Sequence, residues 1–206
     1  MSKNSSSARW KARQARDPFV KRAQAEGWRS RAVFKLSELQ GRERLLKPGS
    51  VVVDLGAAPG AWSQFAAGVA GAQGLVLAVD LLPMANLAGV EIFQGDFREA
   101  ATVNVLLSRL AGRPVDLVLS DMAPNMTGTR VVDQPRTMHL AELASDFAGQ
   151  VLRPGGALVV KLFQGEGFQE YVESTRSQFA SVRMRKPAAS RSGNRETYLV
   201  ARNFRL

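Results

Sequence analysis

Cysteine is absent from this sequence of 206 residues, and histidine occurs once, at His139. A chain without thiols forms no disulfide, has no thiolate metal site and has no cysteine nucleophile. A single histidine also excludes the clusters of imidazole ligands that bind zinc in many enzymes. We therefore expect no metal in this protein.

Long apolar segments are missing as well. No run reaches the roughly 18 apolar residues that a membrane-spanning helix needs, and the first residues lack the apolar stretch of a secretory signal. Hydrophobic residues nevertheless make up 45% of the chain, which is enough for a packed core. The sequence predicts a cytoplasmic protein without membrane contact, and we expect a monomer.

Acidic residues are scarce near the N-terminus. Residues 1–35 contain ten lysines and arginines but only two acids, so this segment carries +8 of the formal net charge of +10. A nearly neutral body with one basic segment is typical of proteins that bind a polyanion, most often a nucleic acid. A solubilising tail is the plainer alternative. We predict that residues 1–27 form a flexible arm, or one that is helical only when bound, and that residues 28–206 form the folded domain.

After the arm, apolar runs alternate with helical patterns. The predicted strands are 50–55, 74–80, 90–94, 115–121, 157–163, 182–186 and 197–201, and the predicted helices are 33–39, 61–70, 99–110, 137–152 and 168–179. Strands joined by helices form a parallel sheet that is covered on both faces, whereas the last two strands have no helix between them and should pair antiparallel. The expected fold is therefore α/β and Rossmann-like: a single, mostly parallel sheet with one antiparallel strand near the C-terminus, the layout of class I methyltransferases.

The turn at residues 54–60, with the sequence DLGAAPG, follows a buried strand and opens a helix. Such a turn lets a ligand approach the backbone closely, and Gly56 and Gly60 remove side chains that would block it. The turn lacks the Gly-x-Gly-x-x-Gly pattern that binds a pyrophosphate, which disfavours a dehydrogenase. S-adenosylmethionine has no phosphate, so this turn predicts S-adenosylmethionine as the cofactor.

Acids also follow the next two strands. Asp80 lies where a carboxylate can accept hydrogen bonds from ribose hydroxyls, and Asp96 could accept one from the adenine amino group. Trp62, just inside the helix, could line the cofactor pocket. Each residue has an ordinary structural alternative, since such acids often form caps or turns and tryptophan often packs in a core. Their order after successive strands favours the cofactor site.

Several motifs resemble the FtsJ/RrmJ (RlmE) family of S-adenosylmethionine-dependent 2′-O-methyltransferases, which act on large-subunit ribosomal RNA. The motifs are GWRSRAVFKL at 27–36, VDLGAAPG at 53–60, WSQ at 62–64, DLLPM at 80–84, QGDFR at 94–98, SDMAPNM at 120–126, VKLFQGEG at 160–167 and RKP at 185–187. The resemblance covers roughly residues 18–203. One departure is Ala61, where close bacterial relatives tend to have a second glycine; alanine is small, so we expect little effect.

The resemblance implies a catalytic set of two lysines and two acids. These residues are Lys35, Asp121, Lys161 and Glu196. It also implies that Gly60, Trp62, Asp80, Asp96 and Asp121 contact the cofactor, that S-adenosylhomocysteine is the product, and that ribosomal RNA, within the large ribosomal subunit at a late stage of its maturation, is the partner. Spacing alone does not show that the four catalytic residues meet.

Methyl transfer to a ribose hydroxyl requires that the hydroxyl be positioned and its proton removed. Lys161 could act as the base if its pKa were depressed toward 7–8 from about 10.4; burial and Lys35 favour that, and the acids oppose it. Alternatively, Lys161 stays charged and stabilises developing negative charge on the oxygen. The sequence leaves both roles open.

On the RNA side, the arm and a second basic stretch, Arg183, Arg185, Lys186, Arg191 and Arg195, should flank the same crevice. Contacts of this kind give salt dependence rather than base specificity. A tRNA or cap 2′-O-methyltransferase of the same fold is one alternative. A non-catalytic RNA-binding assembly factor is another, and the intact catalytic set argues against it.

Overall fold

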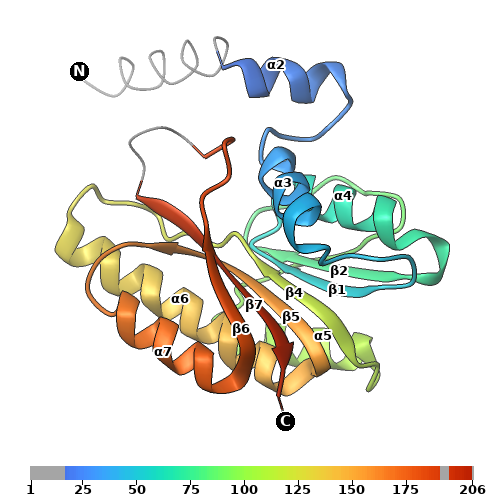
Figure 1. Ribbon diagram of the computed structural model, residues 1–206. Coiled ribbons are helices and arrows are strands. Elements are labelled where there is room, and N and C mark those ends of the chain that lie inside the picture. Colours follow the sequence, from blue (N-terminus) through green and yellow to red (C-terminus); the bar gives the residue numbers. More distant parts are fainter. Residues whose placement is uncertain (1–16, 191–194, 206) are drawn as a thin grey trace.

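The computed structural model describes residues 17–190 and 195–205, and its centre is a seven-stranded sheet (Figure 1). The strands are β1 (Val51–Leu55), β2 (Leu75–Asp80), β3 (Glu91–Gln94), β4 (Val115–Ser120), β5 (Leu152–Phe163), β6 (Phe179–Arg185) and β7 (Glu196–Phe204), in the spatial order β3-β2-β1-β4-β5-β7-β6. Strands β1 to β5 pair in parallel, and β7 is antiparallel to both of its neighbours, β5 and β6. The predicted fold class is confirmed.

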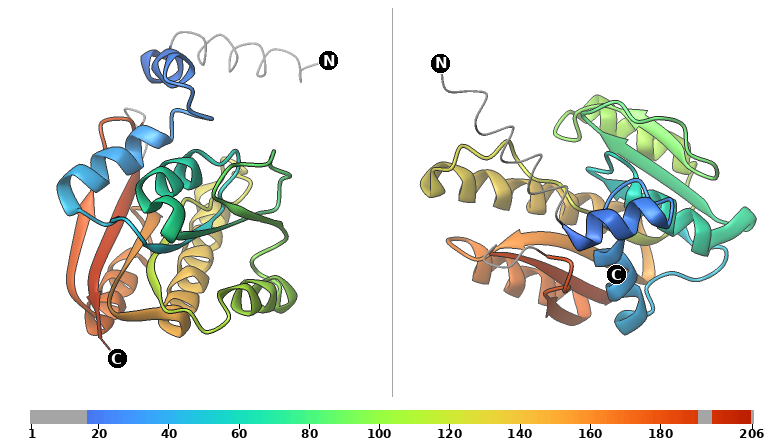
Figure 2. Two further views of the ribbon diagram at one scale, coloured as in Figure 1. Left: turned by 90° about the vertical axis from the view of Figure 1, so that its right-hand side faces the viewer. Right: turned by 90° about the horizontal axis from the view of Figure 1, so that it is seen from above.

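Helices cover the sheet on both faces (Figure 2). They are α2 (Pro18–Ala25), α3 (Val33–Glu43), α4 (Ala61–Ala70), α5 (Ala100–Leu110), α6 (Arg130–Val151) and α7 (Phe168–Gln178), with a 3₁₀ turn at Gly71–Gln73. One apolar cluster joins α5, α6 and α7 to one face of the sheet, and a second joins α3 and α4 to the other. The central strands are buried on both faces, which explains their continuous apolar sequences.

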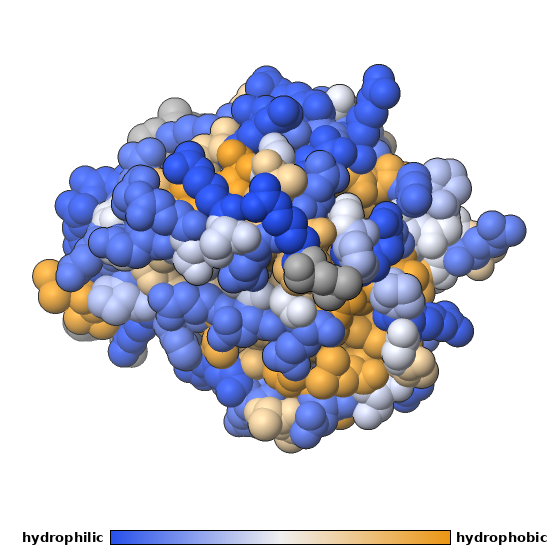
Figure 3. Space-filling model, turned by 60° about the horizontal axis from the view of Figure 1, so that its bottom comes forward, coloured by the Kyte–Doolittle hydropathy of each residue, from blue (hydrophilic) through white to orange (hydrophobic). Residues whose placement is uncertain are grey.

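Among the described residues, no helix is long and apolar enough to cross a membrane. Figure 3 shows the end of the molecule away from α2, where hydrophilic residues predominate and hydrophobic ones are interspersed among them.

Helix α6 begins at Arg130, earlier than the predicted start at residue 137. The Pro- and Gly-rich sequence before it suggested a loop as far as residue 136, but the Asp133 carboxylate accepts hydrogen bonds from the Thr127 backbone N–H and hydroxyl and from the Gly128 N–H. Gln134 donates to the carbonyls of Phe163 and Glu166. These contacts stabilise the first turns despite Pro135, and they hold the loops that follow β4 and β5 against α6.

Residues 18–25 form helix α2, although the sequence predicted a flexible arm there. Asp17 caps the helix by accepting the Phe19 N–H, and proline occupies its first turn, as is common at helix starts. The Phe19 ring packs on Phe34, and Arg31 forms an ion pair with Asp17 and a hydrogen bond with the Ala189 carbonyl. The described end of the arm is therefore docked beside α3, whereas residues 1–16 lie outside the described residues.

Glu43 fixes the last turn of α3 to the sheet. Its side chain is fully buried and forms an ion pair with Arg185 at 2.5 Å, and Arg183 and Arg202 lie 3.2 and 3.9 Å from its other oxygen. The three arginines come from β6 and β7, so two guanidinium groups that the sequence suggested for RNA contact are at least partly engaged within the fold. This cluster holds α3, and with it Lys35, over the ends of these strands.

We predict that Glu43→Gln destabilises the protein by about 1–3 kcal/mol. A buried carboxylate with several charged partners contributes more than a surface pair, but the arginines are one-third to one-half exposed and remain solvated when the acid is removed. Urea unfolding at neutral pH measures the difference. Glu99→Gln, at an exposed acid that forms no salt bridge with a described residue, is the control, and equal stability of the two variants would contradict the assignment.

Candidate functional site

The four predicted catalytic residues meet at the carboxyl ends of β4 and β5. Asp121 directly follows β4, and Lys161 lies near the end of β5. Glu196 is the first residue of β7, which runs in the opposite direction and therefore starts at this edge. Lys35 reaches the same place from α3. The structure thus brings together residues that lie up to 161 positions apart in the sequence.

Two lysine–acid pairs make up the centre of the site. Lys161 Nζ lies 3.0 Å from Asp121 Oδ1 and also donates to the Asp121 backbone carbonyl. Lys35 Nζ lies 2.6 Å from Glu196 Oε1. Each of the four side chains is buried or nearly so, between 8% and 22% exposed. Because two cations face two acids, the cluster is close to neutral, which is what allows charged groups to be buried together.

Tyr198, which the sequence analysis missed, links the two pairs. Its hydroxyl donates to Asp121 Oδ1 at 2.8 Å, lies 3.3 Å from Glu196 Oε1 and accepts from Lys35 Nζ at 2.9 Å. Its ring is fully buried and packs on Trp62 with the ring centroids 5.6 Å apart. The available signal was the strand period of two, which places Tyr198 on the same face of β7 as Glu196.

The electrostatics of the cluster fix two protonation states. Burial alone would raise the pKa of Asp121, but Lys161 and Lys35, with the hydrogen bonds from Lys161 and Tyr198, hold that pKa below its usual value. Burial, together with the charges of Asp121 and Glu196, raises the pKa of the Tyr198 phenol well above its usual value. Asp121 is therefore an ionised acceptor at neutral pH, and Tyr198 is a protonated donor.

The turn between β1 and α4 lies next to this cluster and shares a hollow with it. The hollow is lined by Ser30, Ala32, Asp54, Gly56, Ala57, Ala58, Pro59, Ala61, Trp62 and Asp121. Its volume is only about 20 Å³, roughly the space of a single water. A nucleoside cofactor would therefore extend beyond this hollow.

The two glycines of the turn are required by the protein itself. Both have a positive φ, 74° at Gly56 and 103° at Gly60, which side chains disfavour. A Cβ on Gly56 would lie 2.9 Å from the Cα of Met122, and one on Gly60 would lie 2.9 Å from the guanidinium of Arg29. The glycines thus admit the loop after β4 and the Arg29 side chain, a role that the sequence analysis did not anticipate.

Asp54 supplies an unsatisfied acceptor in the hollow. It is fully buried; Ser63 donates to its Oδ2 at 2.5 Å, and its Oδ1 has no hydrogen-bond partner among the described residues. Burial, with a smaller contribution from Asp121 and Asp80, raises the pKa of Asp54 to about 7. An unpaired buried carboxyl oxygen fits a ligand that brings a cationic donor, and S-adenosylmethionine carries an α-ammonium group. The residues present therefore fit this cofactor.

Asp80 and Arg29 connect the turn to the loop after β2. The Asp80 carboxylate accepts the N–H groups of Ala58 and Leu82, both at 2.8 Å. Each of its oxygens keeps a further lone pair for a ribose hydroxyl. From the other side, the Arg29 guanidinium donates to three backbone carbonyls. These belong to Pro59, Ala85 and Asn86, at 3.1, 2.9 and 2.6 Å.

Asp96 and Trp62, the remaining predicted cofactor residues, both make contacts within the fold. The Asp96 carboxylate pairs with the Arg98 guanidinium at 2.5 Å, which lowers the pKa of Asp96. Neither Asp80 nor Asp96 lines the hollow described above. Trp62 does line it, while its indole N–H donates to the Ala32 carbonyl at 2.8 Å. Trp62 is thus both a core residue and part of the wall. Among the described residues, no cluster of His, Asp and Glu could hold a metal ion.

Comparisons with known proteins give the family. The sequence model of the FtsJ-like methyltransferases matches residues 28–204. The "Ribosomal RNA large subunit methyltransferase E" of Alkalilimnicola ehrlichii is 58% identical over 200 residues, which cover 97% of this chain and 96% of that protein.

Solved structures agree on the fold. A protein of Plasmodium falciparum described as a ribosomal RNA methyltransferase is 26% identical, with a TM-score of 0.76 over 86% of this chain and 98% of its own. A protein of Streptococcus mutans solved in complex with S-adenosylhomocysteine is 15% identical, with a TM-score of 0.53 over 78% of this chain and 90% of its own; that likeness shows the fold alone. The protein is an enzyme and belongs to the FtsJ-like methyltransferase family.

Proposed function

We propose that this enzyme transfers the methyl group of S-adenosylmethionine to the 2′-hydroxyl of a ribose, at a uridine of large-subunit ribosomal RNA. The observation that carries the proposal is the pairing of Lys161 with Asp121 within the Lys35, Asp121, Lys161 and Glu196 set, beside a turn that fits the cofactor. The relative named ribosomal RNA large subunit methyltransferase E supports the choice of RNA.

In this reaction, the ribose oxygen forms a bond to the methyl carbon as the carbon–sulfur bond breaks, and the hydroxyl proton leaves. The cofactor supplies the methyl group on a positively charged sulfur, which makes a good leaving group. The chain must then hold the hydroxyl in line with the methyl group. It must also either accept the hydroxyl proton or stabilise the negative charge that develops on the oxygen. That task needs a positioned nitrogen or oxygen at the edge of the sheet.

Lys161 is the group positioned for that task. Two of its N–H bonds point at oxygens of Asp121, the carbonyl and Oδ1. The remaining position on nitrogen is then available to the acceptor hydroxyl. In a neutral amine it is a lone pair that accepts the proton, and in an ammonium it is an N–H that stabilises the oxygen as charge develops. Either way, Asp121 orients Lys161, and Tyr198 keeps Asp121 in place.

Four side chains would hold the cofactor. The Asp54 carboxyl would accept the α-ammonium, Asp80 the ribose hydroxyls, and Trp62 would pack against the ligand where it lines the hollow. Asp96, whose two oxygens both accept from Arg98, would accept the adenine amino group through a remaining lone pair. Because Gly56 and Gly60 have no side chain, Met122 and Arg29 can pack directly against the turn, which keeps it close to the loops that border this site.

The RNA would reach the site across basic residues of α2, α3 and β6. Exposed Lys21 and Lys186 flank the catalytic edge through α2 and the end of β6. Phosphate contacts from such side chains position the RNA without reading its bases. The ribosomal particle late in large-subunit maturation is the substrate form that we propose.

Replacing Lys161 should slow methyl transfer without weakening the binding of S-adenosylmethionine. We expect Lys161→Met to lower kcat by at least about a thousandfold, because the hydroxyl loses its proton acceptor or its charge partner, while the Kd for S-adenosylmethionine changes by less than about threefold. Single-turnover transfer of labelled methyl to large-subunit particles and calorimetric cofactor binding measure the two quantities. Lys47→Met, at an exposed lysine before β1, is the control. Near-normal turnover by Lys161→Met would refute the role.

The same assay identifies the acceptor. Labelled cofactor is incubated with large-subunit particles, with free ribosomal RNA and with tRNA, and the modified nucleotide is mapped. We expect a 2′-O-methyl uridine in large-subunit RNA. Label on tRNA alone would support a tRNA methyltransferase instead, and no label in spite of bound cofactor would support a binding protein.

Asp54 should make both stability and cofactor binding depend on pH. Its pKa is about 7 when folded, against 3.8 for an ordinary aspartate, so the folded state holds the proton more tightly. The free energy of unfolding of the cofactor-free protein therefore falls as the pH rises from about 4 to about 7 through this group. Asp54→Asn removes that titration, so its stability relative to wild type should rise over the same interval.

The Asp54→Asn variant should also bind S-adenosylmethionine at least about tenfold more weakly at pH 8, because the amide carries no charge for the ammonium. Urea unfolding at several pH values and calorimetric titration measure the two effects. If wild type and Asp54→Asn follow parallel stability curves, the carboxyl does not titrate in this interval.

Arg29 should hold the turn at residues 54–60 against the loop after β2. Arg29→Ala removes three hydrogen bonds to backbone carbonyls, so we expect the KM for S-adenosylmethionine to rise about tenfold with kcat at saturation nearly unchanged. Arg29→Lys keeps the charge but cannot bridge three carbonyls, so it should resemble alanine. Full affinity in the lysine variant would show that charge alone matters.

A further inference from the structure

A second pocket lies beside the catalytic cluster, between the ends of β5, β6 and β7. It has a volume of about 240 Å³ and is lined by Gln164, Met184, Arg185, Lys186, Arg195, Glu196 and Thr197. Glu196 lines this pocket and also belongs to the proposed catalytic cluster, where its side chain pairs with Lys35 and accepts a hydrogen bond from Ser190. This pocket is therefore continuous with the catalytic site but separate from the hollow beside the cofactor turn.

Six of the seven lining residues are polar or charged, and the basic ones outnumber the acidic one. Three of its side chains are basic and one is acidic, and that acid is already paired with Lys35. Arg185 is held by Glu43 at 2.5 Å, which fixes it at the wall. Lys186 and Arg195 are exposed, and the Arg195 guanidinium pairs with no acid in the described part of the chain. An anionic group entering the pocket would meet these cations first.

Other lining residues offer what a nucleobase requires. The exposed Gln164 amide makes no hydrogen bond with any described residue, so its donors and its acceptor are both available. Met184 is half-buried; its apolar, polarisable side chain packs against the core cluster under α5, α6 and α7, and the residue also lines the pocket. Thr197 is buried and donates to the Arg185 carbonyl at 3.0 Å, which ties the two walls together. The walls are thus built before any ligand arrives.

The pocket lies at a distance from Lys161 that suits the nucleotide next to the methylated one. In the β5–β7 pairing, Lys161 lies opposite Tyr198, and Phe163 lies opposite Glu196. Two residues along a strand span about 7 Å, so the pocket begins about that far from Lys161. Gln164 continues β5 past this point, into the pocket wall. A ribose held at Lys161 would therefore place the next nucleotide of its strand at the pocket.

We propose that this pocket binds the nucleotide adjacent to the methylated one, with its phosphate on Arg195 and Lys186 and its base against Met184 and within reach of the Gln164 amide. This inference rests on the proposed function, because it takes RNA as the acceptor. It gives the enzyme a base-contacting residue beside otherwise sequence-independent phosphate contacts. Gln164 is then a residue that determines specificity, and Arg195 is one that binds the backbone.

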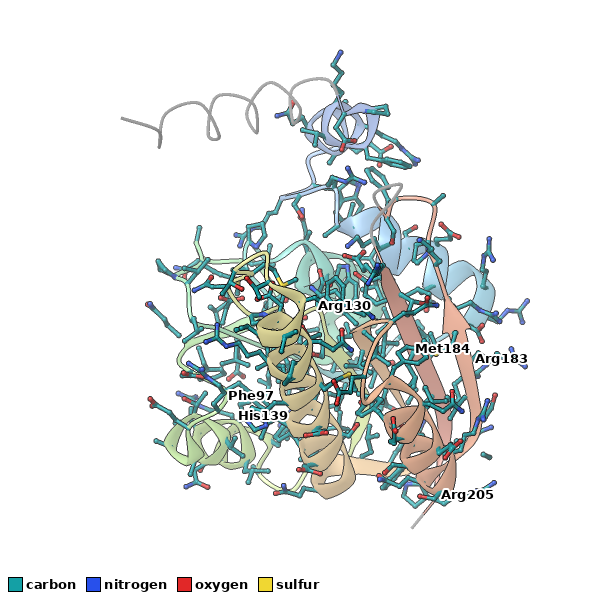
Figure 4. The ribbon with its side chains drawn as sticks, turned by 90° about the vertical axis from the view of Figure 1, so that its left-hand side faces the viewer. Phe97, Arg130, His139, Arg183, Met184 and Arg205 are labelled. Carbon is teal, nitrogen blue, oxygen red and sulfur yellow. The ribbon has the colours of Figure 1, made fainter. Side chains whose placement is uncertain are left out.

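The test compares two pocket variants with two matched controls. Arg195→Ala and Gln164→Ala alter the pocket. Arg205→Ala and Gln73→Ala change exposed residues of the same type elsewhere, on the strand end beyond β7 and on the 3₁₀ turn before β2. Figure 4 shows Arg205 near the C-terminus, well below Met184 at the pocket wall. All four positions are exposed, so thermal unfolding should be close to wild type in each.

Binding is measured first, by fluorescence anisotropy with a short single-stranded RNA of mixed sequence over a range of salt concentrations. We expect Arg195→Ala to raise the Kd about three- to tenfold at low salt and to reduce the slope of log Kd against log salt by about one, as the loss of one phosphate contact does. Arg205→Ala should leave both values unchanged. Equal binding by Arg195→Ala and Arg205→Ala would overturn the pocket assignment.

Catalysis is measured second, with large-subunit particles that carry each base in turn on either side of the methylated nucleotide. We expect Gln164→Ala to reduce the discrimination among these bases while kcat and cofactor Kd stay within about twofold of wild type; unchanged discrimination would refute its role. If the wild-type enzyme methylates no ribosomal RNA, the proposed function is wrong, and the anisotropy measurement still decides whether the pocket binds RNA.

Discussion

The hydroxyl of Tyr198 is buried at the proposed catalytic edge of the sheet, where a phenol without partners would be costly. It contacts Asp121, Glu196 and Lys35, one group from each of three segments that are far apart in the sequence. Because its pKa is raised, the hydroxyl keeps its single proton, which it donates to a carboxylate, while its oxygen accepts from Lys35. The relative positions of the two lysine–acid pairs follow from this one contact set.

The pairing also explains why α3 must be fixed so firmly. Lys35 is the only residue of the proposed catalytic set that comes from a helix rather than from a strand end, and a helix on the face of a sheet could slide. Two anchors prevent this. Glu43 binds arginines of β6 and β7 at one end of α3, and Phe34 packs against Phe19 of α2 at the other. The basic N-terminal segment thereby contributes to the position of Lys35 as well as to the charge of the surface.

The sequence predicted the sheet, and the strand ends that border the candidate site, because those features depend on local patterns. Buried strands are continuous apolar runs, and Asp80, Asp121 and Lys161 lie at or near strand ends that parallel pairing brings to one edge. The missed features depend on contacts between distant segments: the start of α6 on Asp133, the docking of α2 and the role of Tyr198. The family resemblance, and not spacing, assembled Lys35, Asp121, Lys161 and Glu196 as one set.

The reversed direction of β7 is what completes the proposed catalytic edge. In a wholly parallel sheet, only residues at strand ends and in the following loops reach the ligand side. A strand inserted antiparallel between β5 and β6 presents its first residues there instead, so Glu196 and Tyr198 are held by ladder hydrogen bonds rather than by a loop. The same insertion separates β5 from β6 at this end, and their carboxyl ends become the walls of the pocket beside Glu196. One topological feature therefore supplies both a rigid half of the proposed catalytic cluster and the space next to it.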